Sequence, residues 1–260
     1  MTAGGRPPER SEGPAAEVGR WVVIGLLGFP LLAWGLAERL GFAIADAFFL
    51  AALVELLPVL AIAQVPLVGE ARLERVPAYV ASGLTVSTLG LAAAFLGTRS
   101  FGLEGMGLSR PGPASLLSWT VGLSAAAGAL VLLLHALRLR LGVAESPILR
   151  DLLPRTAGER GAFALLALAA GIGEELAFRG YAIKALTPHL GGPWQAATFA
   201  SLTFGLLHAY QGPFGMARTA LLGFLFAGSF LLTGSLWAAM VTHVLVDLAA
   251  GFLWGDRLTR

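Results

Sequence analysis

The sequence of 260 residues lacks cysteine entirely, and only 13% of its residues are charged. The absence of cysteine excludes disulfides, thiolate metal ligands and a cysteine nucleophile. Soluble proteins carry about 25% charged residues, so roughly half that proportion cannot cover a globular surface. Lysine occurs once, at Lys184, and the formal net charge of +2 gives no indication of nucleic-acid binding.

Long apolar segments take the place of these missing residues. Hydrophobic residues make up 56% of the chain, and the mean hydropathy is +0.75. A membrane-spanning helix needs about 20 mostly apolar residues, so we predict an all-α fold, a polytopic transmembrane helical bundle with about eight spans in a lipid bilayer. The predicted spans are residues 21–37, 42–67, 77–96, 115–137, 162–186, 194–209, 217–232 and 236–253.

The spans divide the chain into four parts. Residues 1–20 lack the apolar core and cleavage site of a signal peptide, and we interpret them as a flexible cytoplasmic tail. Residues 21–160 hold the first four spans, residues 161–255 hold the four that carry the candidate chemistry, and residues 256–260 form a short tail. An even number of spans puts both termini on one side, where arginines predominate. This bias predicts cytoplasmic termini and a cell-membrane location.

The fifth predicted span contains three charged residues, in the pattern Glu174-Glu175-x-x-x-Arg179. A charge at the bilayer centre costs about 2.5–3.5 kcal/mol or more, so such residues face the bundle interior and usually have a function. Glu175 and Arg179 are four residues apart and are expected to pair on one helix face. Glu174 lies roughly 140° around a regular helix from Arg179, and we expect it to be free for another role.

Two later spans contain histidines at helical spacing, in Phe204-x-x-x-His208 and His243-x-x-x-Asp247. Polar groups in separate apolar helices are least costly when they gather around one pocket that holds water. In that pocket Glu174 could act as a general base on water, positioned by His208. His243 could stabilise the oxyanion of peptide hydrolysis, with Asp247 fixing its tautomer and orientation.

The same side chains are also suited to a metal ion. Glu174, His208 and His243 could hold a catalytic Zn²⁺ with one position open for water, and the residues leave both mechanisms open. The sequence contains no His-Glu-x-x-His, Gly-x-Ser-Gly or Gly-x-Gly-Asp pattern of other intramembrane proteases. The glycines of residues 102–107 have no strand–helix context for a nucleotide site, so we expect neither nucleotide nor nucleic acid as a partner.

These motifs, in this order, resemble those of the CPBP (CAAX-protease and bacteriocin-processing, or Abi) family of intramembrane proteases. The resemblance covers about the last hundred residues. It implies an eight-helix bundle with a site among the helices, reached from the membrane or the cytoplasm. Eukaryotic members of the family remove the last three residues of prenylated CAAX proteins. The family is named for metalloproteases, although a metal-free glutamate mechanism is also argued for it.

The resemblance also implies residue roles. Glu174 would activate water with His208, Glu175 and Arg179 would hold the helix, and His243 with Asp247 would support the oxyanion. The last motif of the family often ends in Asn, whereas this sequence has Asp247. The chain is thus expected to be an intramembrane endopeptidase that acts on membrane-associated proteins or peptides.

Two alternatives belong to other functional classes. A catalytically silent member could act by binding, in bacteriocin immunity or as a scaffold. A proton-coupled transporter could use Glu174, His208 and His243 as a relay, but all ionisable groups of this set lie in the second half, without an inverted repeat. His135 and His189 are expected to be interfacial and inert. Structural roles are expected for Asp46, Glu55 and Arg218, the last as a side chain that extends toward the membrane surface, with lining of the substrate site as the alternative.

Overall fold

The protein is described by a computed structural model over residues 14–66 and 74–254, and these residues form helices and loops without strands. The all-α prediction is confirmed for this part of the chain. Residues 1–13 of the predicted N-terminal tail and the predicted tail at residues 256–260 lie outside it. Residues 14–20, which we assigned to the tail, instead form the first turns of a helix.

Proline and glycine set many of the helix boundaries. The helices that begin at residues 113, 147, 193 and 212 each have proline in the first two positions, where its missing N–H is not needed. Gly234, with φ 67°, ends the helix before it in the left-handed conformation. The elements of the first half are α1 (Pro14–Leu40), α2 (Ile44–Ala51), the π-helix η1 (Ala52–Leu56), α3 (Leu57–Ala63), α5 (Arg75–Gly105), α6 (Pro113–Arg140) and α7 (Pro147–Asp151).

The second half contains two further π-helical segments. Its elements are α8 (Ala157–Glu174), the π-helix η2 (Glu175–Ala182), α9 (Ile183–Leu186), α10 (Pro193–Leu207), the 3₁₀ turn η3 (Ala209–Gln211), α11 (Gly212–Thr233), α12 (Trp237–Ala249) and the π-helix η4 (Ala250–Trp254). Pi-helical turns are rare in proteins as a whole, but many of those that occur lie at functional sites. The segment η2 is the one that carries the charged motif.

The number of predicted spans is only partly confirmed. Six helices of the described chain are long and apolar enough to cross a membrane, and Trp237–Leu253 is a shorter apolar helix. The span predicted at residues 194–209 is the helix α10, but its 15 residues extend only about 22 Å, less than the hydrocarbon thickness of about 30 Å. Exposed leucines on the long helices, such as Leu91 at 72%, suit contact with lipid. The chain is an integral membrane protein.

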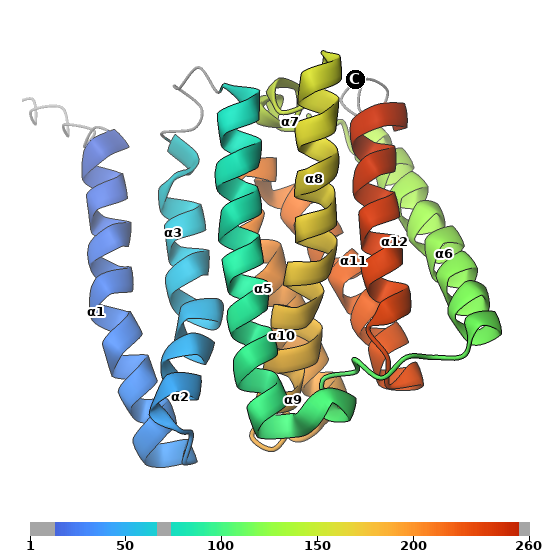
Figure 1. Cartoon of the computed structure of the whole chain (residues 1–260). Helices are drawn as coiled ribbons and strands as arrows, with labels where there is room; N and C mark the ends of the chain where they lie inside the picture. The colour runs from blue at the N-terminus through green and yellow to red at the C-terminus, as the bar shows by residue number, and fades with distance from the viewer. Residues whose placement is uncertain (1–13, 67–73, 255–260) are drawn as a thin grey trace, which may run out of the picture.

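The helices run alternately up and down through one bundle (Figure 1). α1 and α2–α3 stand at one edge, α5 and α8 lie side by side in the middle, α6 stands at the opposite edge next to α12, and α10 and α11 lie behind. The first and the last described residues lie at the same end of the bundle (Figure 1). That this end faces the cytoplasm stays a prediction.

Glycines bring three helices into backbone contact just before the charged motif. A methyl group at Gly173 of α8 would overlap the carbonyl of Val86 in α5, and one at Gly90 would overlap the backbone of Gly173. A methyl group at Gly171 would meet Val244 of α12 at 2.5 Å. Small residues allow such close approach in membrane helices. The contacts fix α8 between α5 and α12 at the depth of Glu174.

Candidate active site

The charged motif lies at the junction of α8 with η2. A capping box begins α8, in which Thr156 and Glu159 bond to each other's backbone N–H. The helix changes from α to π after Glu174, and all eight residues of η2 are buried. A π-helix has a wider turn than an α-helix, so the angles expected for a regular helix no longer hold for Glu174 and Glu175. Both carboxylates therefore reach the same histidine of α12.

Glu175 is the central acceptor of the site. Its side chain is 0% exposed, and its Oε1 lies 3.0 Å from Nη1 of Arg179 and 2.8 Å from Nδ1 of His243. The predicted Glu175–Arg179 pair is confirmed. Removing one member of such a buried pair leaves an uncompensated charge and is strongly destabilising. The pair therefore holds η2 and α12 in a fixed relation.

Aromatic rings enclose the guanidinium group of Arg179. Its Cζ atom lies 4.5 Å from the ring centre of Phe204 and 5.9 Å from that of Phe226. On the α11 side, a methyl group at Gly223 would meet Nη2 of Arg179 at 2.7 Å, so this glycine provides the space for the guanidinium. The ring faces and the Glu175 carboxylate together compensate the buried positive charge. Phe204, predicted as a supporting residue, thus contacts Arg179 directly.

His243 has carboxylates at both ring nitrogens. Nδ1 is hydrogen-bonded to Glu175, and Nε2 lies 3.6 Å from Oε2 of Glu174 and 3.7 Å from Oδ2 of Asp247. Glu175 makes the short bond to the ring, and the expected role of Asp247 in orienting it stays a prediction. The two contacts of Nε2 are too long for direct hydrogen bonds.

His208 lies at the C-terminal end of α10, where the backbone leaves the helix. Its Nδ1 lies 2.9 Å from the carbonyl oxygen of Phe204. Because a carbonyl can only accept, Nδ1 must be the donor, and in the neutral ring Nε2 is then the atom that can accept a proton. The ring also packs edge-on against Phe204, at 4.8 Å between centres. The Phe204-x-x-x-His208 spacing therefore sets both the tautomer and the orientation of this histidine.

The site opens into a cavity of about 200 Å³. His208, His243 and Asp247 line it together, whereas Glu174 is not among its lining residues and lies 3.6 Å from Nε2 of His243. The cavity has room for several water molecules at about 30 Å³ each. Of the three carboxylates around His243, Asp247 is the most exposed, with 34% of its side chain accessible, whereas Glu174 is 14% accessible. The structure thus brings together the residues predicted for the site, and their catalytic roles stay predictions.

The candidate metal ligands are not gathered around one point in the described chain. In the described ranges 14–66 and 74–254, no group of three His, Asp or Glu residues is placed to hold a metal ion. Glu175 takes Nδ1 of His243 and the carbonyl of Phe204 takes Nδ1 of His208, which leaves Nε2 of each histidine as the nitrogen that could bind a metal. The predicted zinc set of Glu174, His208 and His243 stays a prediction.

Three polar residues on the cavity wall were not predicted as site residues. Glu145, Gln211 and Arg218 line the same cavity as the two histidines. Arg218 was expected to have a structural role near the membrane surface, but it forms an ion pair with Glu145 instead, with 2.9 Å between Nη1 and Oε1. Glu145 lies between apolar segments, so hydropathy gave no signal for it.

The fold and this cluster together define a helical integral membrane protein in which carboxylates and histidines of separate helices meet beside a cavity. Residues 157–249 match the family model described as Type II CAAX prenyl endopeptidase Rce1-like. This segment, from the first residue of α8 to the last of α12, is thus a domain of that family, as its motifs predicted. No curated protein and no solved structure is significantly similar to the chain.

Proposed function

We propose that the chain is an intramembrane endopeptidase that hydrolyses peptide bonds of membrane-associated proteins or peptides. The domain at residues 157–249 belongs to a family of CAAX prenyl endopeptidases, which supports protease activity. One observation carries the chemistry: His243 lies between three carboxylates, beside a cavity that His208 also lines. Buried groups that can give and take protons next to a space for water are what amide hydrolysis requires.

In the proposed reaction Glu174 is the general base. Its 3.6 Å contact with His243 is too long for a direct hydrogen bond and leaves an oxygen available to water. Glu174 removes a proton from the water, whose oxygen attacks the carbonyl carbon of the substrate. His208, with Nε2 able to accept, orients that water. The proton then passes to the amide nitrogen as the carbon–nitrogen bond breaks.

His243 supports the negative charge that develops on the substrate oxygen. Nδ1 of His243 donates to Glu175, and in the doubly protonated ring Nε2 can donate as well. The surrounding carboxylates compensate the charge of that ring. Donors aimed at a developing oxyanion are worth roughly 10²–10³ in rate. In this mechanism Glu175 is a positioning residue, because it acts on the substrate only through His243.

The proposed steps use no metal ion. If a zinc ion belongs to the site, Glu174 and Nε2 of His208 and His243 would hold it, and the ion would activate the water. Treatment of the purified protein with a chelator, followed by addition of Zn²⁺, separates the two mechanisms. Unchanged cleavage after chelation is the result that the proposed steps require.

The proposal is tested with purified protein in liposomes and quenched fluorescent peptides anchored in the same membrane. Half of the peptides carry a prenylated CAAX end and half a plain lipid anchor, so that the substrate class is read in the same assay. We expect Glu174→Gln and His208→Ala to lower the cleavage rate by about 10²–10⁴-fold, the usual contribution of a general base.

Two matched variants control for the loss of a charge or a ring. Glu38→Gln and His189→Ala change exposed residues of α1 and of the loop before α10, and we expect both to cleave at the wild-type rate. Full activity of Glu174→Gln would refute the proposed mechanism. A wild-type protein that binds the peptides without cleaving them would instead support a catalytically silent role.

A further inference from the structure

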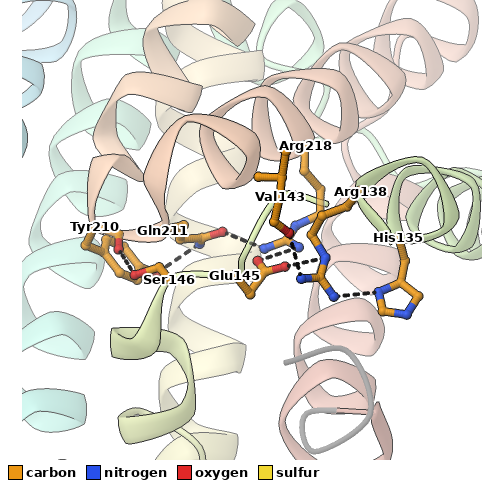
Figure 2. Close-up of polar contacts among 8 residues, drawn as sticks. All are labelled: His135, Arg138, Val143, Glu145, Ser146, Tyr210, Gln211 and Arg218. Carbon is orange, nitrogen blue, oxygen red and sulfur yellow. Dashed lines mark hydrogen bonds and ion pairs between the residues drawn. The ribbon is translucent and has the colours of Figure 1, made fainter. Parts of the chain in front are cut away.

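A second polar network lies on the cavity wall, and it connects the loop after α6 with the turn that follows His208 (Figure 2). At its centre is Glu145, whose side chain is 3% exposed. The carboxylate lies 3.2 Å from Nε of Arg138 in α6 and 2.9 Å from Nη1 of Arg218 in α11. A carboxylate this deeply buried is stable only with such partners. Glu145 thus joins two helices that are distant in sequence.

The network continues from Arg218 to the turn η3. Nη2 of Arg218 donates to Oε1 of Gln211 at 3.1 Å, and Nε2 of Gln211 donates to the Tyr210 hydroxyl at 3.1 Å. The backbone N–H of Gln211 donates to the carbonyl of His208 at 2.9 Å. The position of Gln211 is therefore coupled to that of His208 through the backbone. Figure 2 shows the contacts from Arg218 through Gln211 to Tyr210.

The loop holds the same turn by a second contact. The hydroxyl of Ser146, next in sequence to Glu145, donates to the carbonyl of Tyr210 at 2.8 Å. The loop is in turn fixed to α6, because Nη1 of Arg138 donates to the carbonyl of Val143 at 3.2 Å. Two consecutive loop residues thus hold the segment after His208. Glu145 acts through the side chains of Arg218 and Gln211, and Ser146 bonds to the backbone of Tyr210.

We infer that Glu145 is a positioning residue of the active site, which holds the His208–Gln211 turn in place through Arg218 and Gln211. The inference rests on the proposed role of His208 in hydrolysis. Glu145 and Ser146 lie outside residues 157–249, so the family domain alone does not contain the complete support of its histidine. The loop between α6 and α7 is therefore part of the active site.

The position of His208 can be measured without any substrate. The chain has only four histidines, so protein labelled in its histidine rings gives few NMR signals in nanodiscs, and the spectrum of His208→Ala identifies that of His208. We expect Glu145→Gln to shift the ring signals of His208, while those of His189, at the other end of α10, stay in place. Gln211→Leu, which breaks the same connection without removing a buried charge, should shift them as well.

Kinetics provide the second measurement. A catalytic group displaced by about 1 Å can cost on the order of 100-fold in rate, so we expect Glu145→Gln to lower kcat by at least about tenfold while KM stays within about twofold. Glu145→Asp, which keeps the charge, should restore part of kcat. Glu159→Gln is the matched control, because Glu159 also pairs with an arginine, at 3.6 Å from Arg75, but does not line the cavity.

The outcomes separate this inference from the proposed function. Unmoved His208 signals in both Glu145→Gln and Gln211→Leu would refute the positioning role, whether or not the protein cleaves peptides. A decrease of kcat no larger than that of Glu159→Gln would refute it too. If the two variants shift the His208 signals but the wild-type protein cleaves no peptide, the positioning role would be supported and the protease activity refuted.

Discussion

Two buried polar clusters of this protein differ in how completely their groups are paired. In the first, Asp46 of α2 has one oxygen 2.7 Å from Nη2 of Arg99 and the other 2.9 Å from the hydroxyl of Tyr181, with Ser100 at 3.4 Å. In the active-site cluster, Glu174 and Asp247 come no closer than 3.6 and 3.7 Å to the histidine between them. Only the second cluster adjoins the cavity.

The difference teaches that burial of a charge does not by itself indicate a function. The acidic group of the first cluster has a close partner for each oxygen, and its contacts join α2, α5 and η2. Within the described residues, the second cluster leaves acceptor capacity that water or a substrate can satisfy. Variants of the two clusters should therefore differ in which property they lose, stability or cleavage.

The largest effect on stability and cleavage together is expected for Glu175→Gln. The substitution keeps the size of the side chain but removes the negative charge opposite the buried Arg179, which should cost about 3–5 kcal/mol of stability. Because His243 loses its charged acceptor as well, cleavage should be nearly abolished. Thermal unfolding in detergent and the peptide assay measure the two effects. If Glu175→Gln were as stable as the control variant Glu38→Gln, the Glu175 carboxylate could not be what compensates the charge of Arg179.

A smaller effect on stability, with little on cleavage, is expected for Asp46→Asn. Loss of a charged hydrogen-bond acceptor should cost about 1.5–3 kcal/mol. The rate of cleavage should stay within about threefold of wild type, since the two clusters share no side chain and act independently. If Asp46→Asn instead abolished cleavage in folded protein, the first cluster would have to be counted as part of the site.

The smallest effect is expected for Asp247→Asn. Asn keeps one acceptor oxygen and adds a donor, and Glu175, not Asp247, makes the short bond to His243. We expect cleavage to fall by less than about tenfold, which corresponds to about 1.4 kcal/mol of barrier. Asp247→Ala, which also removes the acceptor, is the comparison. Equal losses in the two variants would indicate that Asp247 acts through its charge.

Much of the site followed from the sequence, since its spacing obeys helix geometry. The pair of Glu175 with Arg179 was predicted from their separation of four residues and is present at 3.0 Å. The short bond between Glu175 and His243 could not be predicted, because a regular helix directs Glu174 and Glu175 to different faces. The π-helix η2 changes these directions, and the spacing rules of a regular helix do not anticipate it.

The role of the loop after α6 was beyond prediction for another reason. Hydropathy marks residues 138–161 only as a connection between spans. The partners of Glu145 are Arg138, a few residues away, and Arg218, more than seventy residues later, so only the folded chain brings all three together. The apolar segments were easier to locate, but α10 was counted as a complete span although its 15 residues are fewer than the roughly 20 that a span needs.

The contact between Gly90 and Gly173 has a consequence for exchanging parts between related proteins. Backbone lies directly against backbone there, with no side chain between α5 and α8 to absorb a change in spacing. A chimera that joined residues 157–249 to a foreign set of N-terminal helices would have to keep a glycine at the position of Gly90. Any larger residue would push α8 outward and carry Glu174, the next residue after Gly173, away from α12.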